Sequence, residues 1–530
     1  MGIPSYLSYI IRNYPGIVRA FNQSHAQKFD HMYFDSNSIV YDAYRQLQED
    51  TDAVINDTTI IDKVITQLEH LIGQICPKKT IFIALDGVAP FAKITQQRQR
   101  RFKSASASTT TTCNINSGET FSTIKITPGT EFMKMLTLRL TRHFTMIGGG
   151  DGGSVDGRNI IISGSDIPGE GEHKIFQHIR ETNKNAMDTY VIYGLDADLI
   201  MLSINHLYIS KNIYIFRETP EFREITIKNA RQQPYTILDV SKLSKNIELH
   251  TGADAQSYIL LCFLLGNDFL PHFPALNLRT NGMDLLLESY KKNVGKTKLI
   301  QNGRIQWRVL SKLLRDIAIS EHDLFIKQTA DRNKLEKKYV MQSLTEGIDP
   351  ELHNPVIYRE LEKYICPEEE GWETRYYRVL FGIETMNDTQ KTSEINEICL
   401  NLLHGLEWTF KYYCGNCVDW RWKYNYHYAP LIADFIKYIP QFETDFFGGV
   451  GGGGLNDPLH PSVQLACVLP RKYLHLLPQY IREHIEKKYL SLYPTTNIKY
   501  IWAYCRYNWE GHLILPEITG DFLDDITSLV

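Results

Sequence analysis

Three runs of apolar residues in the first half of the chain each end abruptly at an aspartate. They lie at residues 31–35, 81–86 and 191–196. Apolar runs of this length, bounded by polar residues, predict buried parallel strands. Ligands of open α/β sheets bind outside the carboxyl ends of such strands. We therefore expect Asp35, Asp86 and Asp196 to lie close together at one edge of a sheet.

The wider pattern predicts an α/β fold. Strand-like and helix-like segments alternate from residue 1 to about residue 290, which indicates a mostly parallel central sheet flanked by helices. Apolar residues at helical spacing from Trp307 to about Val340 predict a long amphipathic helix. Stretches rich in Ser and Thr or in Gly predict flexible loops at 104–123, 148–153 and 448–454.

These segments predict two domains and a connection. Residues 1–345 should form the domain that carries the acidic site, and residues 346–395 read as a polar, irregular connecting segment. Residues 396–530, which are dense in aromatic side chains, should form a second α+β region that packs against the first and completes the pocket.

The composition narrows the class of protein. The chain has 530 residues, 43% of them hydrophobic, which is enough for more than one domain. Lys and Arg number 57 against 61 Asp and Glu, so any basic surface for nucleic acid must be local. Nine scattered Cys suit a reducing compartment, and the most apolar stretch, 258–265, is far shorter than the ~20 residues that span a bilayer. We expect a soluble cytoplasmic protein without membrane contact, with a nuclear location as the alternative.

Four further acids lie in short motifs beside the predicted strands. Glu170 and Glu172 belong to Pro168-Gly-Glu-Gly-Glu-His-Lys174, a glycine-bearing turn that opens a helix. Asp198 lies in a predicted turn with Asp196, and Asp268 follows the apolar segment 258–265. Each has an ordinary alternative, because a Glu in the first turn of a helix suits the helix dipole and an Asp often caps a turn.

Taken together, the acids predict a metal site. Carboxylates crowded in one place repel one another unless a cation neutralises them. Oxygen ligands without a Cys/His cluster favour Mg²⁺ over zinc, and Mn²⁺ could substitute. Two ions about 3.5–4 Å apart can stabilise both oxygens of an in-line phosphoryl displacement. The candidate catalytic and metal-binding residues are Asp35, Asp86, Glu170, Glu172, Asp196, Asp198 and Asp268.

A basic helical face follows the second predicted strand. On a helix, Lys93, Gln97, Arg100 and Arg101 share one side. Arginine forks and an ammonium there could hold a terminal phosphate. The alternative is a solvated basic helix without a ligand.

Aromatic residues supply candidate stacking surfaces. Tyr41 lies six residues beyond Asp35, and Trp420 and Trp422 belong to a cluster of rings at 420–430. Aromatic rings stack on unpaired bases without requiring a particular base sequence. The alternative for each ring is packing in the core, and the sequence leaves open which of the two tryptophans stacks.

The motifs resemble, in order along almost the whole chain, those of the 5′→3′ exoribonuclease family, which has a cytoplasmic mRNA-decay member and a nuclear member. The matching segments are Gly2-Ile-Pro-Ser5, Tyr33-Phe-Asp-Ser-Asn-Ser38, Leu85-Asp-Gly-Val-Ala-Pro90, Gln96-Gln-Arg-Gln-Arg-Arg-Phe102, Ile126-Thr-Pro-Gly-Thr-Glu-Phe132, Pro168–Lys174, Tyr193-Gly-Leu-Asp-Ala-Asp-Leu-Ile200, Leu265-Gly-Asn-Asp-Phe-Leu-Pro-His272 and Tyr426-His-Tyr-Ala-Pro430.

This resemblance implies a PIN-like core related to flap endonucleases, and processive release of 5′-mononucleotides from single-stranded RNA with a 5′-monophosphate. It implies that all seven acids are metal ligands and that the four residues of the basic face hold the terminal phosphate. The family usually has a His where this chain has Tyr41, and its other stacking ring corresponds to Trp420 or Trp422. We expect a monomeric, minimal catalytic core that lacks the family's accessory domains, with unidentified decapping or RNA-cleaving partners.

Two other functions stay open. An acidic site of this kind also suits a 5′ nuclease that cuts DNA flaps, although the phosphate pocket and the second-half aromatics argue against the open passage that flap cleavage needs. A catalytically inactive RNA-binding scaffold would be expected to lack one or more of the acids, and all seven are present.

Overall fold

In the computed structural model of the chain, eight strands form one sheet. The structure describes residue 3 and residues 5–22, 29–107, 121–147, 154–155, 158–182, 185–219, 234–346, 349–384, 387–448 and 457–530. Across the sheet the strands are β1 (Val18–Ala20), β8 (Tyr235–Asp239), β7 (Ile213–Glu218), β6 (Tyr190–Tyr193), β2 (His31–Asp35), β3 (Thr80–Ala84), β5 (Arg158–Ser163) and β4 (Ser154–Val155).

The five central strands, from β7 to β5, are parallel to one another, and antiparallel pairing occurs only at the two edges of this sheet. Such an arrangement buries both faces of the parallel strands beneath helices. The predicted α/β fold with a mostly parallel sheet is therefore confirmed.

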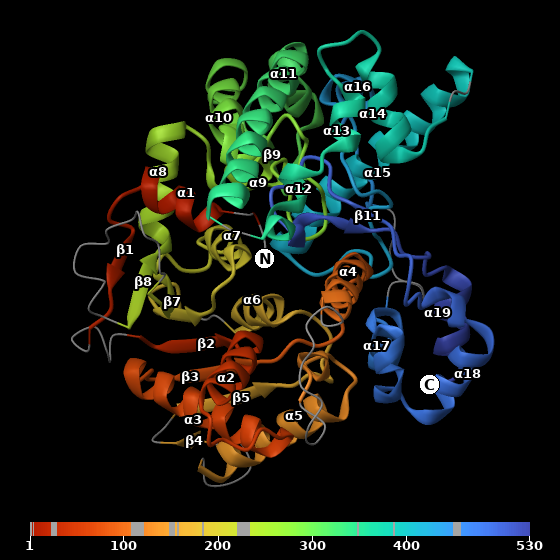
Figure 1. Cartoon of the computed structure of the whole chain (residues 1–530). Coiled ribbons are helices and arrows are strands. Elements are labelled where there is room, and N and C mark those ends of the chain that lie inside the picture. The colour runs from red at the N-terminus through yellow and green to blue at the C-terminus, as the bar shows by residue number, and fades with distance from the viewer. Residues whose placement is uncertain are drawn as a thin grey trace.

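Helices cover both faces of the sheet (Figure 1). One face packs on α2 (Asn37–Glu49), α3 (Asp57–Ile75) and α5 (Glu131–Ile147), and the other on α6 (Gly171–Thr182), α7 (Ala197–Asn205) and α8 (Val240–Thr251). Along β2, Met32 and Phe34 join the first core while Tyr33 joins the second. This alternation follows from the two-residue period of side chains along a strand.

The long predicted helix is confirmed as α11 (Trp307–Glu346), which packs with neighbouring helices above the sheet. The other helical elements of this part are α1 (Tyr6–Asn13), α9 (Ala255–Phe263), η4 (Leu278–Thr280), α10 (Gly282–Asn293), α15 (Asp388–Cys414) and α16 (Ile432–Tyr438), with the short strand pair β9 (Ile300–Gln301) and β10 (Arg304–Ile305). Helix α15 runs without a break across the predicted division at residues 395 and 396.

The prediction of an irregular connecting segment is wrong for the described residues there. They form η5 (Pro350–His353), α12 (Asn354–Ile357), α13 (Glu360–Ile365) and α14 (Trp372–Phe381). Helices α12 and α13, of four and six residues, offer too few turns for a periodic apolar pattern, whereas α14 buries Trp372, Tyr376, Tyr377 and Leu380 at helical spacing. A buried network also holds α13, in which Glu362 accepts hydrogen bonds from the guanidinium groups of Arg332 (2.6 and 2.7 Å) and Arg359 (2.6 Å).

The last part of the described chain packs against α4 (Phe91–Ala107) and is largely helical. It contains α17 (Pro461–Val468), η6 (Arg471–Leu476), α18 (Gln479–Lys488), η7 (Leu490–Leu492), β11 (Tyr500–Ile501), η8 (Asn508–Glu510), β12 (His512–Leu513) and α19 (Gly520–Thr527). Arg98 donates to the carbonyl oxygens of Pro516 (2.6 Å) and Leu492 (2.7 Å). One side of α4 is thereby fixed to the C-terminal region, and Figure 1 shows α4 between that region and the sheet.

The predicted loops are only partly covered by the structure. Helix α4 extends through residue 107, and η2 (Thr123–Lys125) closes the predicted Ser/Thr-rich loop, so its two ends are helical. Residues 108–120, 148–153 and 449–454 lie outside the described residues. Among the residues that are described, no helix is long and apolar enough to cross a membrane.

Candidate active site

The carboxyl ends of three adjacent parallel strands bring three aspartates together. Asp35 is the last residue of β2, Asp86 lies two residues beyond β3, and Asp196 caps α7 after β6. The strands are in register at this edge, because Phe34 pairs with Tyr193 and Asp35 with Ala84. All three aspartates line one cavity of about 410 Å³.

Most of the predicted site residues line this cavity. They are Asp35, Tyr41, Asp86, Lys93, Gln97, Arg100, Arg101, Glu170, Glu172 and Asp196. Asp198 and Asp268 do not line it but are buried nearby, at 5% and 8% exposure. Asp198 lies in the first turn of α7 rather than in the predicted turn, because α7 begins at Ala197.

Gly171 sits where the carboxylates are most crowded. It is the first residue of α6, and its backbone N–H donates to Asp86 Oδ1 at 2.8 Å. A Cβ at this position would lie 2.6 Å from Asp35 Oδ1 and 3.5 Å from Asp86 Oδ1. The glycine between Glu170 and Glu172 thus allows α6 to approach the strand ends closely.

Asn37 is a site residue that the sequence reasoning missed. Its side-chain amide donates to Asp86 Oδ2 at 2.5 Å, and its Oδ1 accepts from the backbone N–H of Asp86 at 3.1 Å. This pair of hydrogen bonds fixes the orientation of the carboxylate. Asn37 lies two residues beyond Asp35 and also lines the cavity, so its proximity in sequence to the first aspartate was the available signal.

The acids lie in an environment that penalises unneutralised negative charge. Burial raises the pKa of Asp35 well above its usual value, and the neighbouring Asp86 and Asp196 raise it further. The pKa of Glu172 is raised in the same way by burial, Glu170 and Asp35. Burial together with Asp268 raises the pKa of Asp198 to about 7. Such carboxyl groups either take up protons or require a cation.

The donor atoms fit a divalent cation. Carboxylate oxygens of Asp35, Asp86 and Glu172 lie within 4.8 Å of one another, and Glu170, Glu172 and His173 form an overlapping group. Hard cations such as Mg²⁺ prefer oxygen ligands and retain some of their waters. The oxygen-rich set therefore suits a hard divalent cation better than zinc.

Lys93 lies among the acids. Its Nζ is 2.5 Å from Glu170 Oε2 and 2.7 Å from Asp268 Oδ2. Burial alone would lower the pKa of the Lys93 ammonium, but Asp268 and Glu170 raise it well above its usual value. Lys93 thus carries a fixed positive charge between the proposed metal ligands and the rest of the basic face.

The other members of the basic face continue along α4. The Arg100 side chain is exposed, whereas Arg101 is half-buried and donates to the carbonyl oxygen of Ile126 at 3.2 Å. Burial lowers the pKa of Arg101. The Gln97 amide oxygen accepts a hydrogen bond from Gln464 at 3.3 Å. All four residues of the basic face line the cavity that also contains the carboxylates. This agrees with the single helix face that their spacing predicted.

The three predicted stacking rings lie in different environments. Tyr41 is 40% exposed and lines the cavity. Trp422 is 9% exposed and stacks on Trp408 with ring centroids 5.0 Å apart. Trp420 is half-buried, and its carbonyl oxygen accepts from the N–H of Phe91 at the start of α4. Neither tryptophan lines the cavity, and Trp422 belongs to the core.

A tyrosine from the second half of the chain reaches the acids. Tyr412 in α15 donates its hydroxyl to Glu170 Oε1 at 3.0 Å, and its ring stacks on His173 at 3.6 Å between centroids. With Lys93 on Oε2 and Tyr412 on Oε1, both oxygens of Glu170 are held. No sequence signal pointed to Tyr412, because the pair is 242 residues apart.

We expect Tyr412→Phe to weaken divalent metal binding by about 10–100-fold, because hydrogen bonds to a ligand orient it and tune its basicity. The ring and its stacking on His173 would be retained. Titration with Mn²⁺ followed by electron paramagnetic resonance measures the change. Tyr376→Phe is the matched control, since it also removes a buried hydroxyl hydrogen bond, to Ala429, away from the acids. Equal metal affinity of wild type and Tyr412→Phe would exclude this role.

Comparisons with known proteins cover nearly the whole chain. Residues 1–219 match the family model described as XRN 5′-3′ exonuclease N-terminus, and residues 254–354 and 358–528 match the Xrn1 helical domain. The chain is 27% identical to 5′-3′ exoribonuclease 1 of Saccharomyces cerevisiae, over 91% of this chain and 40% of that protein. It is also 27% identical to 5′-3′ exoribonuclease 1 of Homo sapiens, over 98% of this chain and 33% of that protein.

A relative of a second type is 5′-3′ exoribonuclease 2 of Arabidopsis thaliana, 24% identical over 97% of this chain and 66% of that protein. The chain thus spans less than half the length of the exoribonuclease 1 relatives it matches. Among solved structures, the catalytic core of Rad2 in complex with DNA substrate aligns at 14% identity and a TM-score of 0.32. The alignment covers 55% of this chain and 69% of the Rad2 chain.

Proposed function

Because the chain belongs to the XRN 5′-3′ exonuclease family, we propose that it is a metal-dependent 5′→3′ exoribonuclease that processively releases 5′-mononucleotides from single-stranded RNA with a 5′-monophosphate. One observation carries this proposal. A single cavity contains both the carboxylates at the strand ends and the basic face of α4. The group that would hold a terminal phosphate is therefore beside the group that would hold the metal.

The carboxylates are the proposed metal ligands. Asp35, Asp86 and Glu172 would hold one Mg²⁺, and Asp196, Asp198, Asp268 and Glu170 would complete a second site or neutralise the first. Mn²⁺ is the proposed substitute. A bound divalent cation would supply charge stabilisation for the phosphoryl oxygens and lower the pKa of an attacking water. Asn37 and Gly171 hold the Asp86 carboxylate in place through their hydrogen bonds.

The basic face is the proposed receptor for the 5′ phosphate. Arg100 and Arg101 supply forked donors that match phosphate oxygens, and Gln97 adds an amide. Lys93 connects this face to the acids through its contacts with Glu170 and Asp268. A terminal phosphate held here would orient the first phosphodiester toward the carboxylates, which accounts for cleavage from the 5′ end.

Tyr41 is the proposed stacking ring for a base near the 5′ end, because it is exposed within the same cavity. Trp420 is the proposed second ring, since Trp422 is enclosed by the core. Tyrosine can stack on a base but carries no positive charge for a phosphate. The monomeric state, the cytoplasmic location and the recruiting partners remain predictions.

The assignment of the basic face to the 5′ phosphate can be tested by the enzyme's preference between RNAs with different 5′ ends. We expect Arg100→Ala, and Arg101→Ala to a similar extent, to reduce the preference for 5′-monophosphate over 5′-hydroxyl RNA by about tenfold, because each removes one charge-assisted contact. Competing hydrolysis of the two RNAs measures it. Arg142→Ala, an exposed arginine on α5 outside the cavity, should leave the preference unchanged. If the folded Arg100→Ala and Arg101→Ala variants kept the wild-type preference for 5′-monophosphorylated RNA, these arginines would not be the 5′-phosphate receptor.

A further inference from the structure

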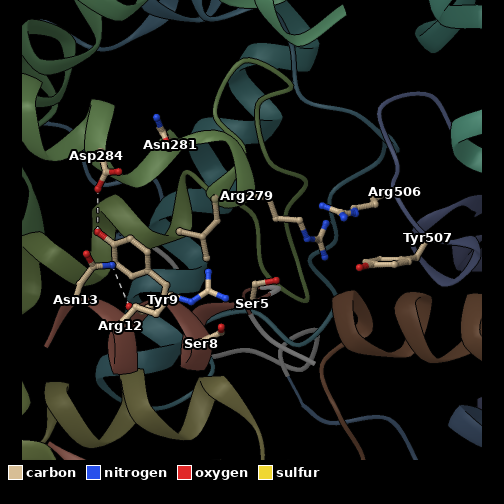
Figure 2. Close-up of a pocket in the computed structure, with 11 residues that line it drawn as sticks. Ser5, Ser8, Tyr9, Arg12, Asn13, Arg279, Asn281, Asp284, Arg506 and Tyr507 are labelled. Atoms are coloured by element: carbon tan, nitrogen blue, oxygen red, sulfur yellow. Dashed lines mark hydrogen bonds between the residues drawn. The ribbon is translucent and has the colours of Figure 1, made fainter. Parts of the chain in front are cut away.

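A second cavity has a volume of about 400 Å³, and Figure 2 shows the residues that line it. Three separate segments form it, namely α1 with the residue before it, η4 with the start of α10, and the chain just before η8. Its lining includes Ser5, Ser8, Arg12, Arg279, Arg506 and Tyr507. None of them lines the candidate active site.

The charged lining of this cavity is mainly positive, with three arginines against one aspartate. Asp284 accepts a hydrogen bond from the Tyr9 hydroxyl at 3.2 Å. Figure 2 shows this pair at the opposite end of the cavity from Arg506 and Tyr507. The one acid among the lining residues is therefore set apart from Arg506.

Two of the guanidinium groups share one aromatic ring. The Cζ atoms of Arg279 and Arg506 lie 5.2 and 5.6 Å from the ring centroid of Tyr507. Tyr507 in turn stacks on Trp509, with centroids 4.3 Å apart and an angle of 8° between planes. Figure 2 shows the two arginine side chains pointing toward one another beside Tyr507. The two guanidinium groups therefore concentrate positive charge beside this ring, which favours an anion as the ligand.

One carboxylate of the protein, that of Glu510, neutralises only part of this positive charge. Glu510 Oε1 accepts from Arg279 at 2.7 Å, while Glu510 Oε2 accepts from the backbone N–H of Arg506 at 2.8 Å. Among the described residues the Arg506 side chain forms no ion pair, and its Nε is buried without a hydrogen-bond partner. One guanidinium group thus remains without a carboxylate partner in the part of the chain that the structure describes.

The remaining groups favour phosphate as the ligand. Arginine forks pair with phosphate oxygens in a bidentate manner. The hydroxyl groups of Ser5 and Ser8 add donors, and the Ser5 side chain makes no capping hydrogen bond to α1. The positive end of the helix dipole of α1 lies at the same place.

Helix α4 connects this cavity with the candidate active site. Lys103 donates to the carbonyl oxygen of Trp509 at 3.0 Å. Lys103 lies three residues beyond Arg100, which is about 5 Å of helical rise. The Tyr507–Trp509 pair is therefore attached to the same helix that carries the proposed 5′-phosphate receptor.

We propose that this second cavity binds a phosphate group of a ribonucleotide, and that this group is a backbone phosphate of the RNA strand whose 5′ end occupies the candidate active site. The RNA assignment rests on the proposed function. A free mononucleotide offers the same chemistry and is the alternative source of the phosphate.

The test measures RNA binding in EDTA, where hydrolysis does not interfere, by fluorescence anisotropy with 5′-monophosphorylated RNAs of about four and about twenty nucleotides. We expect Arg506→Gln and Arg12→Gln each to weaken binding of the long RNA about tenfold and to reduce its salt slope by about 0.7, because one phosphate contact is lost. The short RNA should bind as before, which also reports that the variants are folded. Arg471→Gln, an exposed arginine outside both cavities, is the control.

Unchanged affinity for the long RNA in both variants, or an equal loss for both RNA lengths, would overturn the RNA assignment. A calorimetric titration with adenosine 5′-monophosphate distinguishes the sources. Loss of one nucleotide site in Arg506→Gln, with RNA binding unchanged, would assign the cavity to the free nucleotide. If neither nucleotide binding nor RNA binding changed in the variants, the cavity would not be a phosphate site. Hydrolysis of the same long RNA by the wild type with Mg²⁺ tests the proposed function separately, so the two failures are distinguishable.

Discussion

Asp196→Asn should lower the rate of RNA hydrolysis by about 10³-fold or more, while the fold and RNA binding without metal persist. Asp196 lines the candidate active site, is exposed, and caps α7 without a side-chain capping hydrogen bond. The isosteric amide therefore removes one negative charge from the cavity with little structural change. Single-turnover hydrolysis of 5′-monophosphorylated RNA in Mg²⁺ measures the rate, and anisotropy in EDTA measures binding.

Asp521→Asn is the matched control for this variant. Asp521 is also an exposed aspartate at the start of a helix, in the first turn of α19, and it does not line the candidate active site. The Asp521→Asn variant should hydrolyse RNA at the wild-type rate. Near wild-type hydrolysis by Asp196→Asn would show that this carboxylate takes no part in catalysis.

Gly171→Ala should reduce hydrolysis by about 10²-fold while the protein stays folded. A Cβ at residue 171 would lie 2.6 Å from Asp35 Oδ1, so the carboxylate or the start of α6 must move, and a shift of about 1 Å at a reacting centre costs about this factor. Alanine favours a helix interior over glycine by about 1 kcal/mol, which offsets part of the cost of this shift. Hydrolysis rates and urea unfolding, measured on the same preparation, separate a loss of activity from a loss of folded protein.

The chain contains a matched control for the glycine substitution. Gly520 is the first residue of α19, as Gly171 is of α6, and a Cβ there would meet nothing within 4 Å. Gly520→Ala should leave both stability and hydrolysis close to those of the wild type. If Gly171→Ala remained fully active, the close approach of α6 to the carboxylates would be unimportant for the reaction.

The elements that the sequence predicted well are those with a strong local pattern. The apolar runs that end at Asp35, Asp86 and Asp196 lie on three neighbouring parallel strands, because the burial of both sheet faces leaves a continuous apolar signal. Helix α11 was predicted from its periodicity. The helical face of Lys93, Gln97, Arg100 and Arg101 follows from the geometry of a single helix, so it needed no knowledge of the tertiary structure.

The features that the sequence did not predict depend on contacts between distant residues. Tyr412 reaches Glu170 from α15, and no local pattern relates the two. The stacking of Trp422 on Trp408 likewise depends on how residues 420–430 fold back on α15. The short helices α12 and α13 are held by Arg332, which donates to Pro355 in α12 and to Glu362 in α13, and no local pattern predicts these contacts. In each case the position of the residue or helix depends on tertiary contacts, which the local sequence pattern does not reveal.

The most direct test of the proposed function uses wild-type protein and uniformly labelled RNAs that carry a 5′-monophosphate, 5′-hydroxyl, 5′-triphosphate or cap, beside a DNA flap, with Mg²⁺ and with EDTA. We predict that the monophosphorylated RNA is converted to 5′-mononucleotides from its 5′ end in Mg²⁺, and that EDTA stops the reaction. Hydrolysis that continued in EDTA, internal cleavage products, or preferential cutting of the DNA flap would contradict the proposal.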